Sequence, residues 1–224
     1  MKKSLLVLVS SVLFAGAAGA GSVSFKVGYY MPNADSDLWA QNMEILTLEK
    51  DDFDQFTFTV ESDFFVGNYV NVCLGTGYYE KSVDTVDRDF VWEDNGAPIR
   101  QTLSLRIVPL EGSIKLYPAG RERPLIPYVG AGVGAYFWEY VEIGDFVIYR
   151  DTNPTLVSGA FSTETVSPGY NLRVGLQVPV GRSTVDAEVK YVKVDGDLST
   201  AFDPEFEPFD LSGLQVNFGW SYWF

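Results

Sequence analysis

Hydrophobic and polar residues alternate strictly along the carboxy-terminal stretch 214–224. Six apolar or aromatic side chains share one face of this stretch, namely Leu214, Val216, Phe218, Trp220, Tyr222 and Phe224. Such period-two order is typical of a β-strand with one wholly apolar face. Because chain ends fray, a soluble domain rarely leaves such a surface at its terminus, whereas a lipid bilayer accommodates it.

The same alternation occurs eight times after residue 20, where no stretch has sustained 3.6-residue periodicity. We expect strands over 23–31, 54–66, 69–81, 100–117, 125–142, 167–179, 183–194 and 211–224. Short connections at 67–68, 119–124 and 181–182 alternate with long ones around 32–53, 82–99, 143–166 and 195–210. Tight turns at one end and long loops at the other are typical of an up-and-down barrel. The sequence therefore predicts an all-β fold, an eight-stranded antiparallel up-and-down transmembrane β-barrel.

Glycines indicate which face of the strands points inward. Eight of them fall on polar faces, namely Gly28, Gly75, Gly77, Gly130, Gly132, Gly134, Gly175 and Gly219. Glycine in a strand is chosen where space is short. The lumen of an eight-stranded barrel is only wide enough to be filled by side chains, so the polar face is expected to line it.

Pro109 lies inside the long fourth strand and cannot donate a ladder hydrogen bond. We expect a β-bulge there, with the outward face changing from Ile107 to Ile114 and Leu116.

Charged residues on the expected inner faces form a candidate lumen network. The ten residues are Lys26, Glu61, Asp63, Arg106, Glu111, Lys115, Arg173, Asp186, Glu188 and Lys190. Five are basic and five acidic, and charges in a narrow lumen must pair. We therefore interpret them as a salt-bridge plug. A selectivity path, or a paired-carboxylate site at Asp186 and Glu188, is the alternative interpretation.

The amino-terminal residues have the pattern of a secretory signal. Lys2 and Lys3 precede an apolar run over 5–18, and small residues end at Ala20. The run is too short for a comfortable transmembrane helix. We expect a signal peptide over 1–20 and one β-barrel domain over 21–224.

Composition excludes several function classes. The formal net charge is −14, or −16 without Lys2 and Lys3, which makes a nucleic-acid-binding face improbable. The chain has no His and one cysteine, Cys73. Metal sites built on imidazole or paired thiolates, intramolecular disulfides and His-dependent catalytic triads are therefore excluded. We expect no cofactor and no enzymatic activity.

The long connections and the strand ends beside them are acidic, with net charges of −6 over 32–54, −3 over 80–100, −4 over 139–164 and −6 over 195–210. The fourth contains Asp195 and Asp197 separated by Gly196, a weak resemblance to the start of a calcium loop. Divalent cations at the loops are a candidate partner, although solvated charge is the simpler interpretation.

Aromatic residues fall into two groups. Near strand ends lie Tyr117, Tyr128, Trp138, Tyr140, Trp220, Tyr222 and Trp223, and those that face outward are expected to form interfacial girdles. Trp39 instead lies in the first long connection with other apolar residues. We expect this segment to fold over the barrel mouth or extend a strand, with a ligand or partner contact as the alternative.

The terminal strand, the signal, the loop asymmetry and the segment 126–138 (IPYVGAGVGAYFW) together resemble the small outer-membrane barrels of the outer-membrane protein A/W and opacity-protein type. The resemblance implies a location in the bacterial outer membrane and contact with its lipid and lipopolysaccharide. A small barrel presents no obvious broken lipid face, so we expect a monomer. It also implies that Phe218, Trp220, Tyr222 and Phe224 are read by the barrel-assembly machinery. The predicted function is an integral outer-membrane protein with a structural or surface-interaction role; the alternative is a passive conduit for small, apolar solutes.

Overall fold

The computed structural model describes residues 21–92, 96–150, 153–202 and 206–224. The expected signal peptide over 1–20 lies outside the described residues. Within the described part of the chain, no helix has the length and apolar character needed to cross a bilayer.

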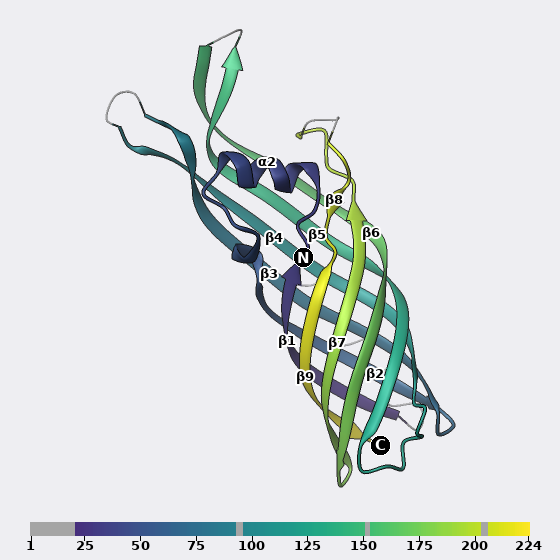
Figure 1. Cartoon of the computed structure of the whole chain (residues 1–224). Coiled ribbons are helices and arrows are strands. Elements are labelled where there is room, and N and C mark those ends of the chain that lie inside the picture. Colours follow the sequence, from purple (N-terminus) through teal and green to yellow (C-terminus); the bar gives the residue numbers. More distant parts are fainter. Residues whose placement is uncertain (1–20, 93–95, 151–152, 203–205) are drawn as a thin grey trace.

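Eight long antiparallel strands close into one barrel (Figure 1). They are β1 (Gly21–Pro32), β2 (Gln55–Val66), β3 (Val70–Val91), β4 (Pro98–Leu116), β5 (Ile126–Arg150), β6 (Asn153–Val180), β7 (Ser183–Gly196) and β9 (Gly213–Trp223). Each strand pairs with the next, and β9 pairs with both β7 and β1, which closes the cylinder. Three short described elements are not among the eight long strands, namely helix α2 (Asp37–Ile45), the 3-10 turn η1 (Lys50–Phe53) and strand β8 (Phe209–Asp210), which pairs with the end of β7. The predicted fold class is confirmed.

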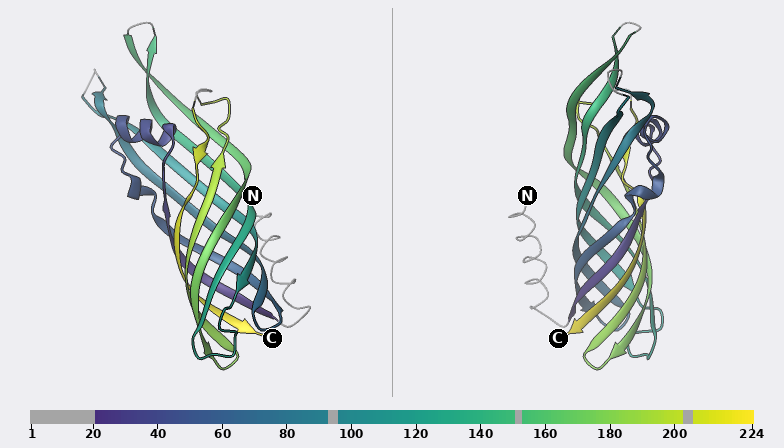
Figure 2. Two further views of the ribbon diagram at one scale, coloured as in Figure 1. Left: turned by 45° about the vertical axis from the view of Figure 1, so that its right-hand side comes forward. Right: turned by 90° about the vertical axis from the view of Figure 1, so that its left-hand side faces the viewer.

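Tight turns lie at one end of the barrel and long connections at the other, as Figure 2 shows. Gly67 and Gly181 have φ values of 68° and 65°, a left-handed conformation that glycine adopts without strain. Ser22 near the start of β1 pairs with Trp223 near the end of β9, at the end with the tight turns. The alternation of short and long connections therefore predicted the topology correctly.

The strands are longer than predicted at the open end. β3, β5 and β6 have 22, 25 and 28 residues, and their hairpins project beyond the rest of the barrel (Figure 1). The expected loops around 82–99 and 143–166 are therefore largely extended hairpins; for example, Arg150 pairs with Asn153. The outward residues of upper β3 and β4 are largely polar, among them Ser82, Asp84 and Arg100, so the alternation of a lipid-facing strand is weak there.

The outer surface changes from apolar to polar along the barrel axis. On β3, Val72 and Leu74 face outward near the tight turns, whereas Glu80, Ser82 and Asp84 face outward near the open end. Exposed apolar side chains occupy the lower band on all eight strands, including Phe25, Phe58, Val72, Ile114, Val133, Leu172, Val185 and Phe218. A continuous apolar band is the outer surface expected for lipid contact.

The bulge expected at Pro109 is absent. The β4–β5 ladder runs without a shift through Pro109↔Tyr136 and Leu110↔Ala135. Ile107 is buried inside the barrel, so the outward face does not change there. The prediction was wrong because it assumed that apolar residues of upper β4 face lipid. Above the lipid band, the apolar side chains point inward to fill the mouth.

The polar face lines the lumen, as the glycines indicated. A Cβ atom on Gly175 would lie 2.4 Å from the ring of Tyr128, and one on Gly219 would lie 2.7 Å from the side chain of Lys26. The lumen has three layers from the tight turns upward. An aromatic floor contains Tyr117, Ile126 and Tyr128; a charged layer lies above it; and a large apolar cluster fills the mouth.

Candidate functional site

Nine of the ten predicted lumen charges meet in one layer across the barrel. Lys26 comes from β1, Glu61 and Asp63 from β2, Glu111 and Lys115 from β4, Arg173 from β6, and Asp186, Glu188 and Lys190 from β7. Each has 5% or less of its surface exposed. Strand alternation explains the arrangement, because residues two apart on a strand share a face.

Arg173 and Glu61 lie at the centre of this layer, which we call the charged layer. Arg173 Nη1 is 2.5 Å from Glu61 Oε2, and Arg173 Nη2 is 3.3 Å from Glu111 Oε2. Lys115 Nζ also contacts Glu61 and lies 3.1 Å from Asp63 Oδ1. Glu61 is therefore held by cations from β4 and β6, and Lys26 of β1 adds a third.

Two further lysines extend the layer toward β7. Lys26 Nζ lies 3.1 Å from Glu188 Oε2, 3.4 Å from Glu61 Oε1 and 3.5 Å from Asp186 Oδ1. Lys190 Nζ lies 3.1 Å from Glu111 Oε2. Each of the five carboxylates thus contacts at least one cation, which is the condition for keeping ionised groups buried.

Neutral donors complete the layer, and the sequence analysis missed them. The Tyr128 hydroxyl lies 2.9 Å from oxygens of both Asp186 and Glu188. The Tyr136 hydroxyl donates to Glu111 at 2.6 Å, and the Cys73 thiol donates to Asp63 at 2.6 Å. Their positions in the sequence could have revealed the two tyrosines. Tyr128 and Tyr136 share the strand face of Gly130, Gly132 and Gly134, which the sequence analysis assigned to the lumen.

Arg106 does not belong to the charged layer, which corrects the prediction. It faces outward above the lipid band and pairs with Glu139 of β5, and both side chains are about one quarter exposed. Without a bulge at Pro109, the even-numbered residues of β4 face outward along its whole length. The layer therefore holds four bases and five acids rather than five of each, so neutral donors are needed to complete its hydrogen bonding.

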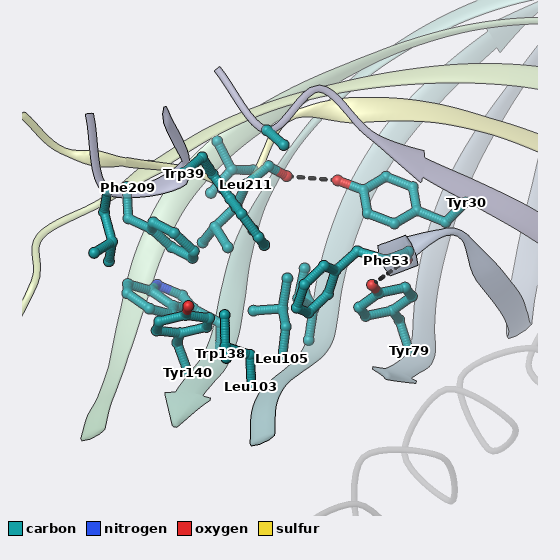
Figure 3. Close-up of a cluster of buried hydrophobic side chains, with 14 of the residues drawn as sticks. Tyr30, Trp39, Phe53, Tyr79, Leu103, Leu105, Trp138, Tyr140, Phe209 and Leu211 are labelled. Carbon is teal, nitrogen blue, oxygen red and sulfur yellow. Dashed lines mark hydrogen bonds between the residues drawn. The ribbon is translucent and has the colours of Figure 1, made fainter. Parts of the chain in front are cut away.

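The mouth is closed by the apolar cluster in Figure 3, which we call the mouth cluster. Trp39 from α2 is 1% exposed and lies between the ring of Phe53, at 4.7 Å, and the ring of Phe209, at 4.9 Å. Its indole nitrogen donates to the carbonyl of Asp210 at 3.0 Å. The expectation that the Trp39 segment folds over the mouth is confirmed.

Hydroxyl groups fasten the connections to the barrel at the same level. Tyr30 donates to the carbonyl of Leu211 at 2.6 Å, and Tyr79 donates to the carbonyl of Phe53 at 2.6 Å (Figure 3). Backbone carbonyls of irregular segments need such donors when they are buried. Through these two hydrogen bonds, side chains of β1 and β3 hold the irregular segments around Leu211 and Phe53.

Four aromatics considered for a girdle are inside the barrel. Tyr117, Tyr128, Trp138 and Tyr140 are each 1% exposed or less, so they fill the floor and the mouth. Trp220 and Tyr222 face outward and are 47% and 42% exposed, while Trp223 packs against the floor. Phe218 and Phe224 share the outward face, with 65% and 47% exposure. Their role as an assembly signal stays a prediction.

A small cavity lies between the charged layer and the mouth cluster. It measures about 40 Å³ and lies between Tyr30, Ile107 and Tyr136 above and Glu111 and Lys190 below. Such a volume accommodates only a few water molecules.

The acidic pair considered for divalent cations is not assembled as a site within the described residues. Asp195 instead pairs with Lys193 at 2.6 Å, and this contact raises the pKa of Lys193. The one described group with metal-compatible spacing is Glu61, Asp63 and Cys73, where the ammonium of Lys115 contacts both carboxylates. Cation binding at the loops stays a prediction.

The chain is similar in fold to several solved structures. Neisserial surface protein A has a similar fold with 11% identity and a TM-score of 0.56, and the alignment covers 92% of this chain and 99% of that one. The chain has the fold of a small outer-membrane β-barrel. Identity this low shows the fold alone.

Two other solved structures also align over most of their length. A major outer membrane protein from Thermus thermophilus is 15% identical with a TM-score of 0.48, covering 92% of this chain and 100% of that one. The N-terminal barrel domain of Pseudomonas aeruginosa OprF is 13% identical with a TM-score of 0.41, covering 91% and 99%. No protein-family model matches the sequence, and no curated protein matches it.

Proposed function

We propose that the chain is an integral protein of a bacterial outer membrane with a closed lumen and a non-catalytic role. In this role it stabilises the envelope or presents its acidic hairpins to external partners. The apolar outer band contacts lipid, and divalent cations bridge the acidic connections to anionic lipopolysaccharide.

The observation that carries the closed lumen is the charged layer. Nine buried charged side chains contact one another from five strands, and Arg173 alone contacts Glu61, Glu111 and Glu188. The mouth cluster lies above this layer, with a cavity of about 40 Å³ between them. An ion would have to displace paired charges and then cross an apolar layer, which costs several kcal/mol at each step.

The non-catalytic role rests on the chemistry of the same residues. The chain has no His, and its single thiol at Cys73 is buried against Asp63. The carboxylates of the charged layer are held by cations, so they lack the freedom of a general base that must reach a substrate.

Planar-bilayer recording on the refolded protein tests the closed lumen. We expect no sustained ion conductance from the wild type. An Arg173→Ser, Glu111→Ser double variant is the matched positive control, because it shortens two side chains of the charged layer while removing one charge of each sign. Sustained conductance from the wild type would overturn the plug and favour a conduit. Swelling of vesicles in a neutral solute covers the case of a non-ionic conduit.

The location is tested separately in cells by adding protease from outside. Cleavage confined to the hairpins of β3–β4 and β5–β6, with the barrel intact, is expected for an outer-membrane protein with these hairpins outside. Recovery of the folded chain in a soluble fraction would contradict the location.

A further inference from the structure

A pocket of about 390 Å³ opens beside the mouth cluster, on the side of the projecting hairpins. Its walls come from α2, from the upper parts of β3, β4, β5 and β6, and from the connection between β7 and β8. This volume lies within the range of sites that hold small molecules. The pocket is separate from the charged layer, so its occupation does not depend on whether the lumen is closed.

Most of the pocket wall is apolar. Phe146 and Phe161 come from the β5–β6 hairpin, Phe202 from the β7–β8 connection, and Leu38 and Leu46 from the α2 region. Phe146 and Phe161 pack edge to face, with ring centroids 4.8 Å apart. These side chains offer a surface for an apolar ligand body, with aromatic rings for shape.

Two carboxylates, from Glu142 of β5 and Asp87 of β3, also line the pocket. They are 6% and 7% exposed, and no Lys or Arg occurs among the described lining residues. Buried carboxylates are usually paired with a cation, as the charged layer of the same molecule shows. This pocket lacks such a partner within the described wall.

Each carboxylate is held through one oxygen. Glu142 Oε1 accepts from Asn42 Nδ2 at 2.7 Å and from the Tyr140 hydroxyl at 2.7 Å. Asp87 Oδ1 accepts from the amides of Asp89 and Phe90, both at 2.9 Å. Their positions are therefore fixed before any ligand arrives, which lowers the entropic cost of binding.

Burial raises the pKa of Glu142, and the hydrogen bonds from Tyr140 and Asn42 offset only part of that shift. A raised carboxyl pKa means that the ionised form lacks stabilisation. A bound cation would supply it.

We propose that this pocket binds a small amphiphilic amine, with its ammonium group at Glu142 and its apolar body against Phe146, Phe161 and Phe202, while Asp87 adds negative charge to the same wall. A neutral amphiphile of the same shape gains only the apolar contacts. An anionic one is opposed by both carboxylates. The charge of the ligand head group is therefore the feature that the site selects.

Calorimetric titration of the full chain in lipid nanodiscs tests this, with empty nanodiscs as the blank. The probes are 4-phenylbutylamine, 4-phenylbutanol and 4-phenylbutyrate, which share the apolar body and differ in head-group charge. We expect the amine to bind at least about tenfold more tightly than the alcohol, the effect of one hydrogen bond to a charged group, and the butyrate to bind most weakly. Equal binding of the three probes, or no binding of the amine, would overturn the proposal.

Matched variants locate the site. Glu142→Gln keeps an acceptor for Asn42 and Tyr140 but removes the charge. It should therefore weaken binding of the amine about tenfold and leave binding of the alcohol unchanged. Glu139→Gln removes a carboxylate from the outer face of the same strand and should change neither. Phe146→Ser should weaken amine and alcohol alike. If Glu142→Gln unfolds the chain, Asp87→Asn removes negative charge from the same wall and should weaken binding of the amine but not of the alcohol. Amine binding that is unchanged in every folded carboxylate variant would refute the site.

Discussion

The charged layer and the mouth cluster close the same barrel by opposite chemistry. The charged layer is built almost entirely from strand residues, whose positions are fixed by the ladders of the wall. The mouth cluster is built from side chains of α2, η1 and β8 as well as strands, so residues as far apart as Trp39 and Phe209 stack directly. One layer follows from the barrel itself, and the other depends on connections folding back over it.

The two layers also differ in how they fail. Buried ion pairs add little net stability compared with apolar packing, but removing one partner leaves uncompensated charge in a site that water does not reach. Apolar contacts in the mouth are lost in proportion to the atoms removed, and the connections there have a local route to opening. Within the described chain, the charged layer is therefore the part least tolerant of a single substitution.

The largest effect is expected from Arg173→Ala. Its removal leaves Glu61, Glu111 and Glu188 short of a cation, and we expect the free energy of unfolding to fall by about 3–5 kcal/mol. Urea unfolding of the refolded barrel measures the change. Arg106→Ala is the matched control, because its pair with Glu139 is partly exposed to water and should contribute less than about 1 kcal/mol. Similar losses for both arginines would refute the distinction between buried and outward charge.

Trp39→Ala tests the mouth cluster. The indole is buried against Phe53 and Phe209, and its loss should destabilise the mouth by about 2–4 kcal/mol. We expect this as local opening, measured as faster hydrogen exchange and proteolysis over 33–54 while the barrel ladders stay protected.

The control for Trp39 is Ile45→Ala on the same helix. Ile45 is 41% exposed, so its truncation should change local stability by no more than about 0.5 kcal/mol. If Trp39→Ala instead unfolded the whole barrel in one step, the two layers would be one cooperative unit rather than two.

The sequence predicted the barrel and the charged layer through one regularity, the alternation of faces along each strand. Once glycines such as Gly130 and Gly175 marked the inner face, the positions of Lys26, Glu61 and Glu188 followed from counting by two. Tyr128 and Tyr136 could have been found by the same count. Tyr128 was missed because it was considered for the membrane interface rather than for the lumen, and Tyr136 was not considered.

The prediction failed where the surroundings of the wall change. Upper β4 has apolar Leu103, Leu105 and Ile107 on its inner face and polar Arg106 on its outer face, the reverse of a strand in lipid. A period-two pattern does not say which solvent lies on each side. The reversal follows from the mouth cluster, which depends on contacts between residues distant in sequence, and those contacts cannot be deduced from local pattern.

A smaller effect is expected from Gly175→Ala at the border of the charged layer and the floor. The added methyl group would meet the Tyr128 ring at 2.4 Å and displace the hydroxyl from Asp186 and Glu188. We expect a loss of about 1–3 kcal/mol in urea unfolding, typical of overpacking. Gly159→Ala is the control on the same strand, where no described atom lies within 4 Å of the added group. Equal stabilities of the two variants would mean that the lumen has spare room.

The smallest effect on stability is expected outside both layers, at Phe224. This ring is 47% exposed on the lipid face, and the terminal amide donates to the carbonyl of Gly21 at 3.0 Å. Deleting Phe224 removes one interfacial ring and two backbone hydrogen bonds with Gly21, and because chain ends fray this should lower the free energy of unfolding by only about 1 kcal/mol. If the terminal residue is also read during assembly, the amount inserted in cells should fall far more than this loss explains. Phe25→Ala separates the two effects, because it removes a lipid-facing ring of similar exposure, 49%, from β1 and leaves the terminal strand intact. We expect normal insertion of Phe25→Ala, poor insertion of the Phe224 deletion, and similar folding of both into detergent. Normal cellular insertion of the shortened chain would refute a recognition role for Phe224 and leave it as one lipid-facing ring among many.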